Sequence, residues 1–216
     1  MVLSLIKTLE LYDNYTGGHS QEVAILSRKI AIEMGLSEQS IYDIYWAGIV
    51  HDIGKIGISY EILNSKNKLT TEQYDLVKMH PIYGSEILYQ SEDLYSIAEI
   101  VKHHHEWWDG NGYPDHLKGN EIPFGAQVLC VADCVSAMHG IRPYAPTKNP
   151  IEIIQELKAF SGKQFNSKIA NIMIKLILIY KYLSNINKTI NINIFLFVSF
   201  FNYLSCFKVL SSAVLS

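Results

Sequence analysis

Cysteine is scarce in this sequence, which has Cys130, Cys134 and Cys206 and no Cys-x-x-Cys pair. The odd number and the spacing argue against both a disulfide framework and a thiolate zinc site. Charge of one sign is not in large excess either, because 18 basic and 21 acidic residues give a formal net charge of −3. This balance gives no electrostatic reason to expect DNA or an anionic membrane surface as a partner. The cysteine usage fits a reducing compartment, and we predict a cytoplasmic protein.

A long apolar run is also missing. Residues 1–7 lack the charged lead and apolar core of a signal peptide, so none is predicted. The apolar segment at residues 192–207 is interrupted by polar residues and is shorter than the roughly 20 residues of a membrane span, so membrane association is not expected. From residue 171 to the end there are four lysines and no acidic residue. This shift predicts a domain at residues 1–178 and an atypical apolar, Asn-rich tail at residues 179–216, for which a frame-shifted end is one hypothesis.

Alternation of apolar and polar residues with a period of two is absent over any long segment, which argues against a β-sheet. Helix signals are present instead. Thr70 with Gln73 and Asn149 with Glu152 have the spacing of helix N-caps. Apolar residues recur at helical spacing within residues 19–34, 38–53, 88–105 and 126–138. We predict an all-α fold.

Side chains of the kind that bind metals recur along the chain. His51-Asp52 and His104-His105 are adjacent pairs in helical patterns, and Asp133 lies in an apolar run where an unpaired carboxylate is costly to bury. Each alone is more commonly a surface group or a hydrogen-bonded core residue. Together they exceed the needs of one ion and suit two ions about 3.5–4 Å apart. Ligation by nitrogen and oxygen without thiolate fits iron, manganese or zinc. The full set is His19, His51, Asp52, His80, His104, His105 and Asp133.

The order of several motifs resembles the HD-GYP family within the HD superfamily of phosphohydrolases. The segment HDIGK at residues 51–55 resembles the core signature of the superfamily, and HHEWWDGNGYP at residues 104–114 resembles the motif that names the subfamily. The resemblance covers about residues 5–176. It implies an HD-domain helical bundle around a dinuclear metal site, and a metal-dependent phosphodiesterase that hydrolyses cyclic di-GMP to pGpG in bacterial second-messenger signalling, with GMP as an open alternative end product.

The resemblance also implies roles for individual residues. The seven side chains above would bind metal, with Asp52 as the bridge and as a catalytic residue. Tyr15 stands where some members have a glutamate for a third ion, so two divalent ions are implied, iron or manganese first and zinc or others as alternatives. Lys55 would contact a phosphate and act in catalysis, and its alternative is a solvent-facing lysine at a helix end. The other implied substrate contacts are Gly112, Tyr113, Pro114 and Arg142.

The sequence departs from the family pattern at Tyr12, Ser136 and Ala145, where an arginine, an aspartate and a basic residue are usual. The change at Ala145 is expected to weaken substrate binding. Two alternatives stay open: an HD phosphohydrolase of another cyclic dinucleotide or nucleotide, and a catalytically silent module that recruits partners such as GGDEF-type diguanylate cyclases. A homodimer stays open as well. The histidines that match no ligand position, and are predicted not to bind metal, are His103, His116 and His139.

Overall fold

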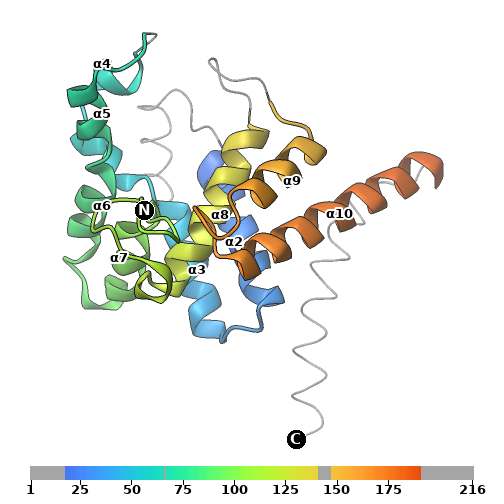
Figure 1. The fold of residues 1–216 in the computed structure, drawn as a ribbon. Coiled ribbons are helices and arrows are strands. Elements are labelled where there is room, and N and C mark those ends of the chain that lie inside the picture. Colours follow the sequence, from blue (N-terminus) through green and yellow to red (C-terminus); the bar gives the residue numbers. More distant parts are fainter. Residues whose placement is uncertain (1–17, 66, 141–146, 191–216) are drawn as a thin grey trace, which may run out of the picture. The chain divides into compact units, whose positions relative to one another are not determined.

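The computed structural model describes residues 18–65, 67–140 and 147–190, with the side chains of residues 184–190 excluded. The described ranges contain helices and no β-strand, and Ser161 and Phe165 form an isolated bridge. The prediction of an all-α fold is therefore confirmed (Figure 1). The elements are α2 (His19–Glu33), α3 (Glu38–Val50), η1 (Ile53–Gly57), α4 (Tyr60–Leu63), α5 (Thr71–Val77), α6 (His80–Leu88), η2 (Glu92–Leu94), α7 (Tyr95–Lys102), η3 (Gly119–Glu121), α8 (Phe124–His139), α9 (Pro150–Ala159) and α10 (Ser167–Ile190).

Helix α8 runs through the centre of the core. It packs against α2, α3 and α7, and α2 also packs along α3 (Figure 1). All residues from Gly125 to Ala132 are buried, as expected for a helix that other helices surround. Leu129 has no exposed surface, and truncating such a leucine to alanine typically costs about 2–5 kcal/mol. Asp133 follows Leu129 by one turn, so the packing of α8 fixes where its carboxylate lies.

The helix ends confirm several signals read from the sequence. Helix α5 begins with a capping box, in which the Thr70 hydroxyl accepts from the Gln73 N–H and the Gln73 side chain accepts from the Thr70 N–H. Asn149 and Glu152 form the same arrangement at the start of α9. Gly35 follows α2 with φ of 70°, a left-handed conformation that glycine adopts without steric cost.

Two predicted helices are shorter than expected. Helix α3 stops at Val50, before the predicted end at residue 53, and α7 covers only part of the predicted segment 88–105. The pairs His51-Asp52 and His104-His105 therefore follow a helix and do not lie within one. The apolar spacing runs on past both helix ends, so periodicity alone could not locate them. In a continuous helix adjacent side chains diverge by about 100°, whereas these backbone turns let both members of a pair face one site.

Contacts between residues divide the chain into two units, 1–174 and 175–216, with the division inside α10. The predicted domain boundary at residue 178 stays a prediction. Among the described helices, none combines the length and the hydropathy that crossing a membrane requires. The apolar segment 192–207 and Cys206 lie outside the described residues.

Candidate metal centre

The end of α3 and the start of α6 bring His51, Asp52 and His80 together. The contact depends on Gly54 in η1, because a Cβ at this position would lie 2.0 Å from the carbonyl oxygen of His80. No other residue type fits so close an approach of two backbones. The three side chains are buried, and the carboxylate of Asp52 faces both imidazoles. Its Oδ2 is 3.3 Å from Nε2 of His51, and its Oδ1 is 3.5 Å from Nε2 of His80.

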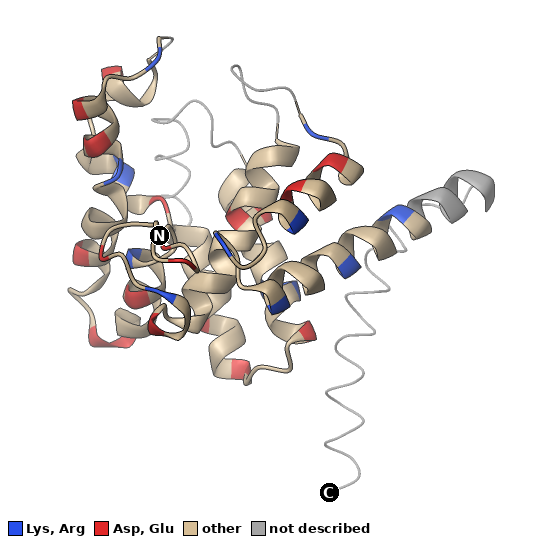
Figure 2. Cartoon of the chain, viewed as in Figure 1, with Lys and Arg blue, Asp and Glu red and all other residues tan. Residues whose placement is uncertain are grey.

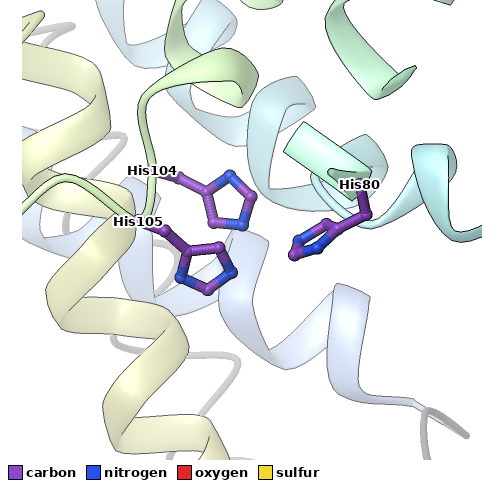
Figure 3. A group of neighbouring side chains, drawn as sticks. All are labelled: His80, His104 and His105. Atoms are coloured by element: carbon purple, nitrogen blue, oxygen red, sulfur yellow. The ribbon is translucent and has the colours of Figure 1, made fainter. Parts of the chain in front are cut away.

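His80, His104 and His105 form a first cluster, which we call the three-histidine group. One ring nitrogen from each lies within 4.8 Å of the others. Figure 3 shows the three rings gathered around a common point, with His80 coming from α6 and the other two from the segment that follows α7. Three imidazoles at this spacing form a donor set that suits a transition metal.

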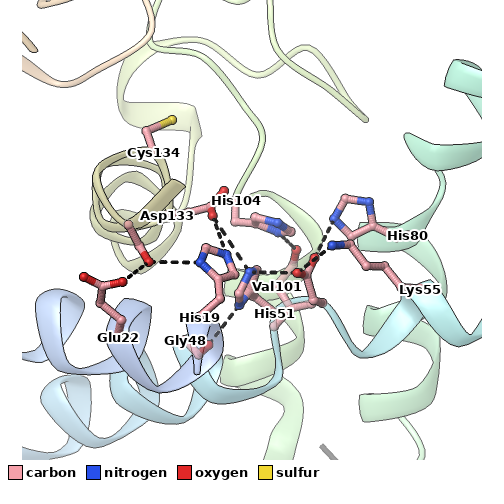
Figure 4. A network of polar contacts seen from close by, with 12 residues as sticks. His19, Glu22, Gly48, His51, Lys55, His80, Val101, His104, Asp133 and Cys134 are labelled. Atoms are coloured by element: carbon pink, nitrogen blue, oxygen red, sulfur yellow. Dashed lines mark hydrogen bonds and ion pairs between the residues drawn. The ribbon is translucent and has the colours of Figure 1, made fainter. Parts of the chain in front are cut away.

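His19, His51 and Asp133 form a second cluster, which we call the mixed group. Its candidate ligand atoms also lie within 4.8 Å of one another. Oδ1 of Asp133 is 3.1 Å from Nε2 of His19 and 4.0 Å from Nε2 of His51. Helices α2 and α8 and the residue after α3 contribute the three side chains, which converge in Figure 4. Two imidazoles and a carboxylate are a common set of protein ligands for a catalytic metal.

Asp52 lies between the two groups. One of its oxygens faces His51 of the mixed group and the other faces His80 of the three-histidine group. This is the position that a carboxylate shared by two ions requires. The Nζ atom of Lys55 is 2.9 Å from Oδ2 of Asp52, and the lysine side chain is only 18% exposed. Lys55 therefore points into the site and not into solvent.

The two groups differ in protonation. Burial lowers the pKa of His105 to about 3 and also lowers the pKa of His104 and His80, so the three-histidine group is neutral near pH 7. Burial alone would lower the pKa of His51, but the charges of Asp52 and Asp133 outweigh it and raise that pKa to about 9.

The two carboxyl groups stay ionised. Burial would raise their pKa values, but the charges of His51 and Lys55 hold the pKa of Asp52 well below its usual range, and the hydrogen bond and charge of His19 do the same for Asp133. Anionic carboxylates are the form that binds a cation. A cation at the mixed group would replace the proton that His51 otherwise carries.

The donor atoms of the site fit a metal. Nε2 of His80 and Nε2 of His104 are buried and make no hydrogen bond. Such an atom is costly to bury unless it has a partner. The Nδ1 atoms of His51, His80 and His104 each lie 2.6–2.9 Å from a backbone carbonyl, to which they donate. Nδ1 is thus occupied in each ring, which leaves Nε2 for a metal: as a lone pair in His80 and His104, and in His51 as the atom whose proton a cation would replace.

The glycine-rich loop at residues 109–114 closes one side of the site. The ring of Tyr113 stacks on His105 with centroids 4.8 Å apart, and the Tyr113 N–H donates to the carbonyl of His105. A Cβ at Gly112 would lie 2.1 Å from the backbone nitrogen of Trp107. Gly112 is thus required for the loop to pack on its own chain. Whether it also contacts substrate stays a prediction.

Glu106 holds the segment that directly follows this loop, a role that the sequence did not reveal. Its side chain is 1% exposed, and its two oxygens accept hydrogen bonds from the backbone N–H groups of Asp115 and Leu117. Burial raises the pKa of Glu106, against the effect of these hydrogen bonds. In the sequence, a glutamate next to two histidines suggests another metal ligand. Its hydrogen bonds with the backbone N–H groups of Asp115 and Leu117 are visible only in the folded structure.

Two predicted substrate contacts and the three histidines predicted not to bind metal remain. Arg142 falls outside the described residues, and Pro114 follows Tyr113 in the loop. Among the described side chains, neither ligand group includes the histidines predicted not to bind metal. His103 contacts Asp115 at 3.0 Å, and His139 contacts Glu22 at 3.4 Å.

Comparison with known proteins gives two kinds of match. The HD domain family matches residues 4–169. The "Cyclic di-GMP phosphodiesterase" of Thermotoga maritima is 40% identical over 178 residues, which cover 81% of this chain and 48% of the relative. The "3'3'-cGAMP-specific phosphodiesterase 2" of Vibrio cholerae is 34% identical over 177 residues, which cover 81% of this chain and 34% of that protein. The chain thus spans about half or less of the length of these relatives.

A solved structure supports the fold. The crystal structure of a cyclic GMP-AMP-specific phosphodiesterase of V. cholerae aligns with a TM-score of 0.63 at 19% identity, over 85% of this chain and 49% of the other. At 19% identity the alignment is evidence for the fold and for no more than the fold.

Proposed function

Because the chain belongs to the HD domain family, we propose that it hydrolyses the phosphodiester bond of cyclic di-GMP to pGpG, with GMP as the alternative end product, in bacterial second-messenger signalling. Phosphohydrolases of this family depend on metal, and the cluster of histidines and aspartates fits a metal site. The observation that carries the proposal is the position of Asp52 between two complete groups of ligand atoms.

The proposed site holds two divalent ions. The three-histidine group would hold one, the mixed group would hold the other, and Asp52 would contact both. Nitrogen and oxygen donors without thiolate favour iron or manganese, with zinc as an alternative. When bound, such ions neutralise charge on the phosphodiester and lower the pKa of water from about 15.7 towards 7.

In this proposal the side chains of the protein position the attacking water and place charge beside the phosphodiester. The carboxylate of Asp52 stays ionised and can accept a hydrogen bond from the attacking water, while the ammonium group of Lys55 lies beside it. Figure 2 marks acidic positions along the ribbon of α5, α6 and α9, with basic positions interspersed among them. An anionic substrate therefore depends on positive charge at the site itself, from the ions and from Lys55.

The loop at residues 109–114 would meet the rest of the substrate. Tyr113 covers one face of His105, so its phenol lies where a nucleotide bound to the three-histidine group would pass. In this proposal Gly112, Tyr113 and Pro114 line the substrate, and Arg142 binds a phosphate as a bidentate donor.

A second cyclic dinucleotide is the alternative substrate. The relative that is 34% identical is named for 3'3'-cGAMP, a molecule with the same ring of two phosphodiesters. Both substrates present the same reacting group, so the metal site does not distinguish them. The choice would depend on contacts with the bases.

The test measures hydrolysis by chromatography after Mn²⁺ or Fe²⁺ is added to purified protein, with cyclic di-GMP and 3'3'-cGAMP offered separately. We expect pGpG or GMP from cyclic di-GMP, and no product from the His51→Ala/Asp52→Ala double variant. His139→Ala is the matched control, since its side chain is 66% exposed and lies outside both ligand groups. Faster turnover of 3'3'-cGAMP would favour the alternative substrate. No turnover by protein that has bound metal would favour a silent module that recruits partners such as diguanylate cyclases.

A further inference from the structure

A chain of two hydrogen bonds leads away from the metal site through α8. Nδ1 of His19 is 2.9 Å from the hydroxyl oxygen of Ser136, and that hydroxyl donates to Oε2 of Glu22 over 2.7 Å (Figure 4). Ser136 is 1% exposed, so water does not compete for its hydroxyl. The link joins residues more than one hundred positions apart in the sequence.

The direction of these bonds fixes the proton on His19. A serine hydroxyl has one hydrogen, and here it points at the carboxylate of Glu22. The Ser136 oxygen can then only accept at its second contact, so Nδ1 of His19 must be the donor. The other ring nitrogen, Nε2, faces Oδ1 of Asp133 at 3.1 Å in the mixed group, so Nε2 is the nitrogen that remains for an ion there.

His19 differs in this respect from three other histidines of the site. His51, His80 and His104 donate through Nδ1 to backbone carbonyls, which no substitution removes. His19 depends on two side chains. Glu22 lies one turn after His19 on α2, and Ser136 lies one turn after Asp133 on α8, so two parallel contacts link these helices at the site.

We propose that Glu22 and Ser136 are positioning residues, which hold His19 as the Nδ1–H tautomer with Nε2 directed at the ion of the mixed group. This inference rests on the proposed metal site. Partners of metal-binding histidines orient the ring and raise its basicity, and their loss typically weakens metal binding by about 10–100-fold. The effect falls on the mixed group, because no member of the three-histidine group touches either residue in the described structure.

The experiment measures metal affinity and stoichiometry by competition with a chromophoric chelator, using Mn²⁺ and Zn²⁺ as probes. Ser136→Ala and Glu22→Ala should each bind one of the two ions about 10–100-fold more weakly and leave the other unchanged. Because both variants interrupt the same link, the double variant should lose little more than Ser136→Ala alone. Melting of the metal-free proteins verifies that each variant folds.

A rescue separates positioning from simple packing. In Glu22→Gln/Ser136→Asp, the new carboxylate can accept directly from Nδ1 of His19, so metal affinity should return towards that of the wild type. The control His139→Ala removes the exposed neighbour of Glu22, at 3.4 Å, and should bind both ions normally.

Two results would overturn the inference: Ser136→Ala binding both ions as tightly as the wild type, or the aspartate variant failing to recover affinity. Failure of the proposed function is distinguishable, since it would appear as wild-type protein that binds metal and hydrolyses no cyclic dinucleotide. In that case the weaker binding by Ser136→Ala and Glu22→Ala would still support the positioning role.

Discussion

The three-histidine group and the mixed group are held in place by partly different kinds of contact. In the first, His80 and His104 are fixed by hydrogen bonds to backbone carbonyls three residues earlier, and burial keeps the rings neutral. In the second, His19 and Asp133 depend on side chains from two separate helices. Backbone contacts survive point substitution and side-chain contacts do not. We therefore expect the mixed group to be the more easily altered half of the site.

The largest effect is expected where the two groups meet. Asp52→Asn keeps the shape of the side chain but removes the charge that faces both His51 and His80. Binding of both ions should weaken, and hydrolysis of cyclic di-GMP should fall by more than the roughly 100-fold upper limit seen for outer-sphere partners. Metal analysis and turnover with Mn²⁺ measure this. Retention of two ions and of activity would contradict the bridging position.

Variants that lack one ligand in either group should show how the two groups differ in metal binding. His104→Ala and His19→Ala should each retain about one metal ion per chain, and the retained ion should resist chelators better in His19→Ala, whose three-histidine group is intact. Both variants should lose hydrolysis, because clamping a phosphate uses both ions. Chelator titration followed by metal analysis makes the comparison. Equal chelator sensitivity in the two variants would remove the distinction between the groups.

A change in the loop should affect substrate and spare the metals. In Gly112→Ala the added Cβ would lie 2.1 Å from the backbone nitrogen of Trp107, so the loop must shift at a cost of roughly 1–3 kcal/mol and carry Tyr113 away from His105. We expect a lower kcat/KM and a lower Tm with unchanged metal content. Asn111→Ala, at an exposed neighbouring position, is the control. Normal activity in Gly112→Ala would show that the loop does not need this close packing.

The sequence predicts the helices and the ligand types because both depend on local or chemical properties. Capping pairs such as Thr70 with Gln73 act within one turn, and histidine and aspartate are metal ligands wherever the chain places them. The end of α3 at Val50 was missed, because apolar spacing continues past it and the turn at Asp52 is stabilised by contacts with a distant helix. The contact between Ser136 and Glu22 was also missed, because it joins two helices that are far apart in the sequence.

The smallest effect is expected outside both groups, at Asp115. Hydrogen bonds from Lys102 and His103 lower the pKa of this carboxyl, although burial acts against them. The folded protein therefore binds fewer protons there than the unfolded chain, so the stabilisation is present above the usual pKa of about 3.9 and is lost as the pH falls through the lower, folded value.

Asp115→Asn should accordingly reduce the free energy of unfolding at pH 7 by less than about 1 kcal/mol, because the side chain is 40% exposed. The difference from the wild type should shrink as the pH falls below about 4. Urea unfolding at pH 3, 5 and 7 measures it, with metal content unchanged throughout. A larger difference at pH 3 than at pH 7 would reverse the assigned sign.

Anomalous diffraction from crystals grown with Mn²⁺ tests the dinuclear centre most directly. We predict two peaks about 3.5–4 Å apart, one among His80, His104 and His105, the other among His19, His51 and Asp133, with Asp52 in contact with both. A single peak, or a peak pair that leaves Asp52 without a metal contact, would contradict the account.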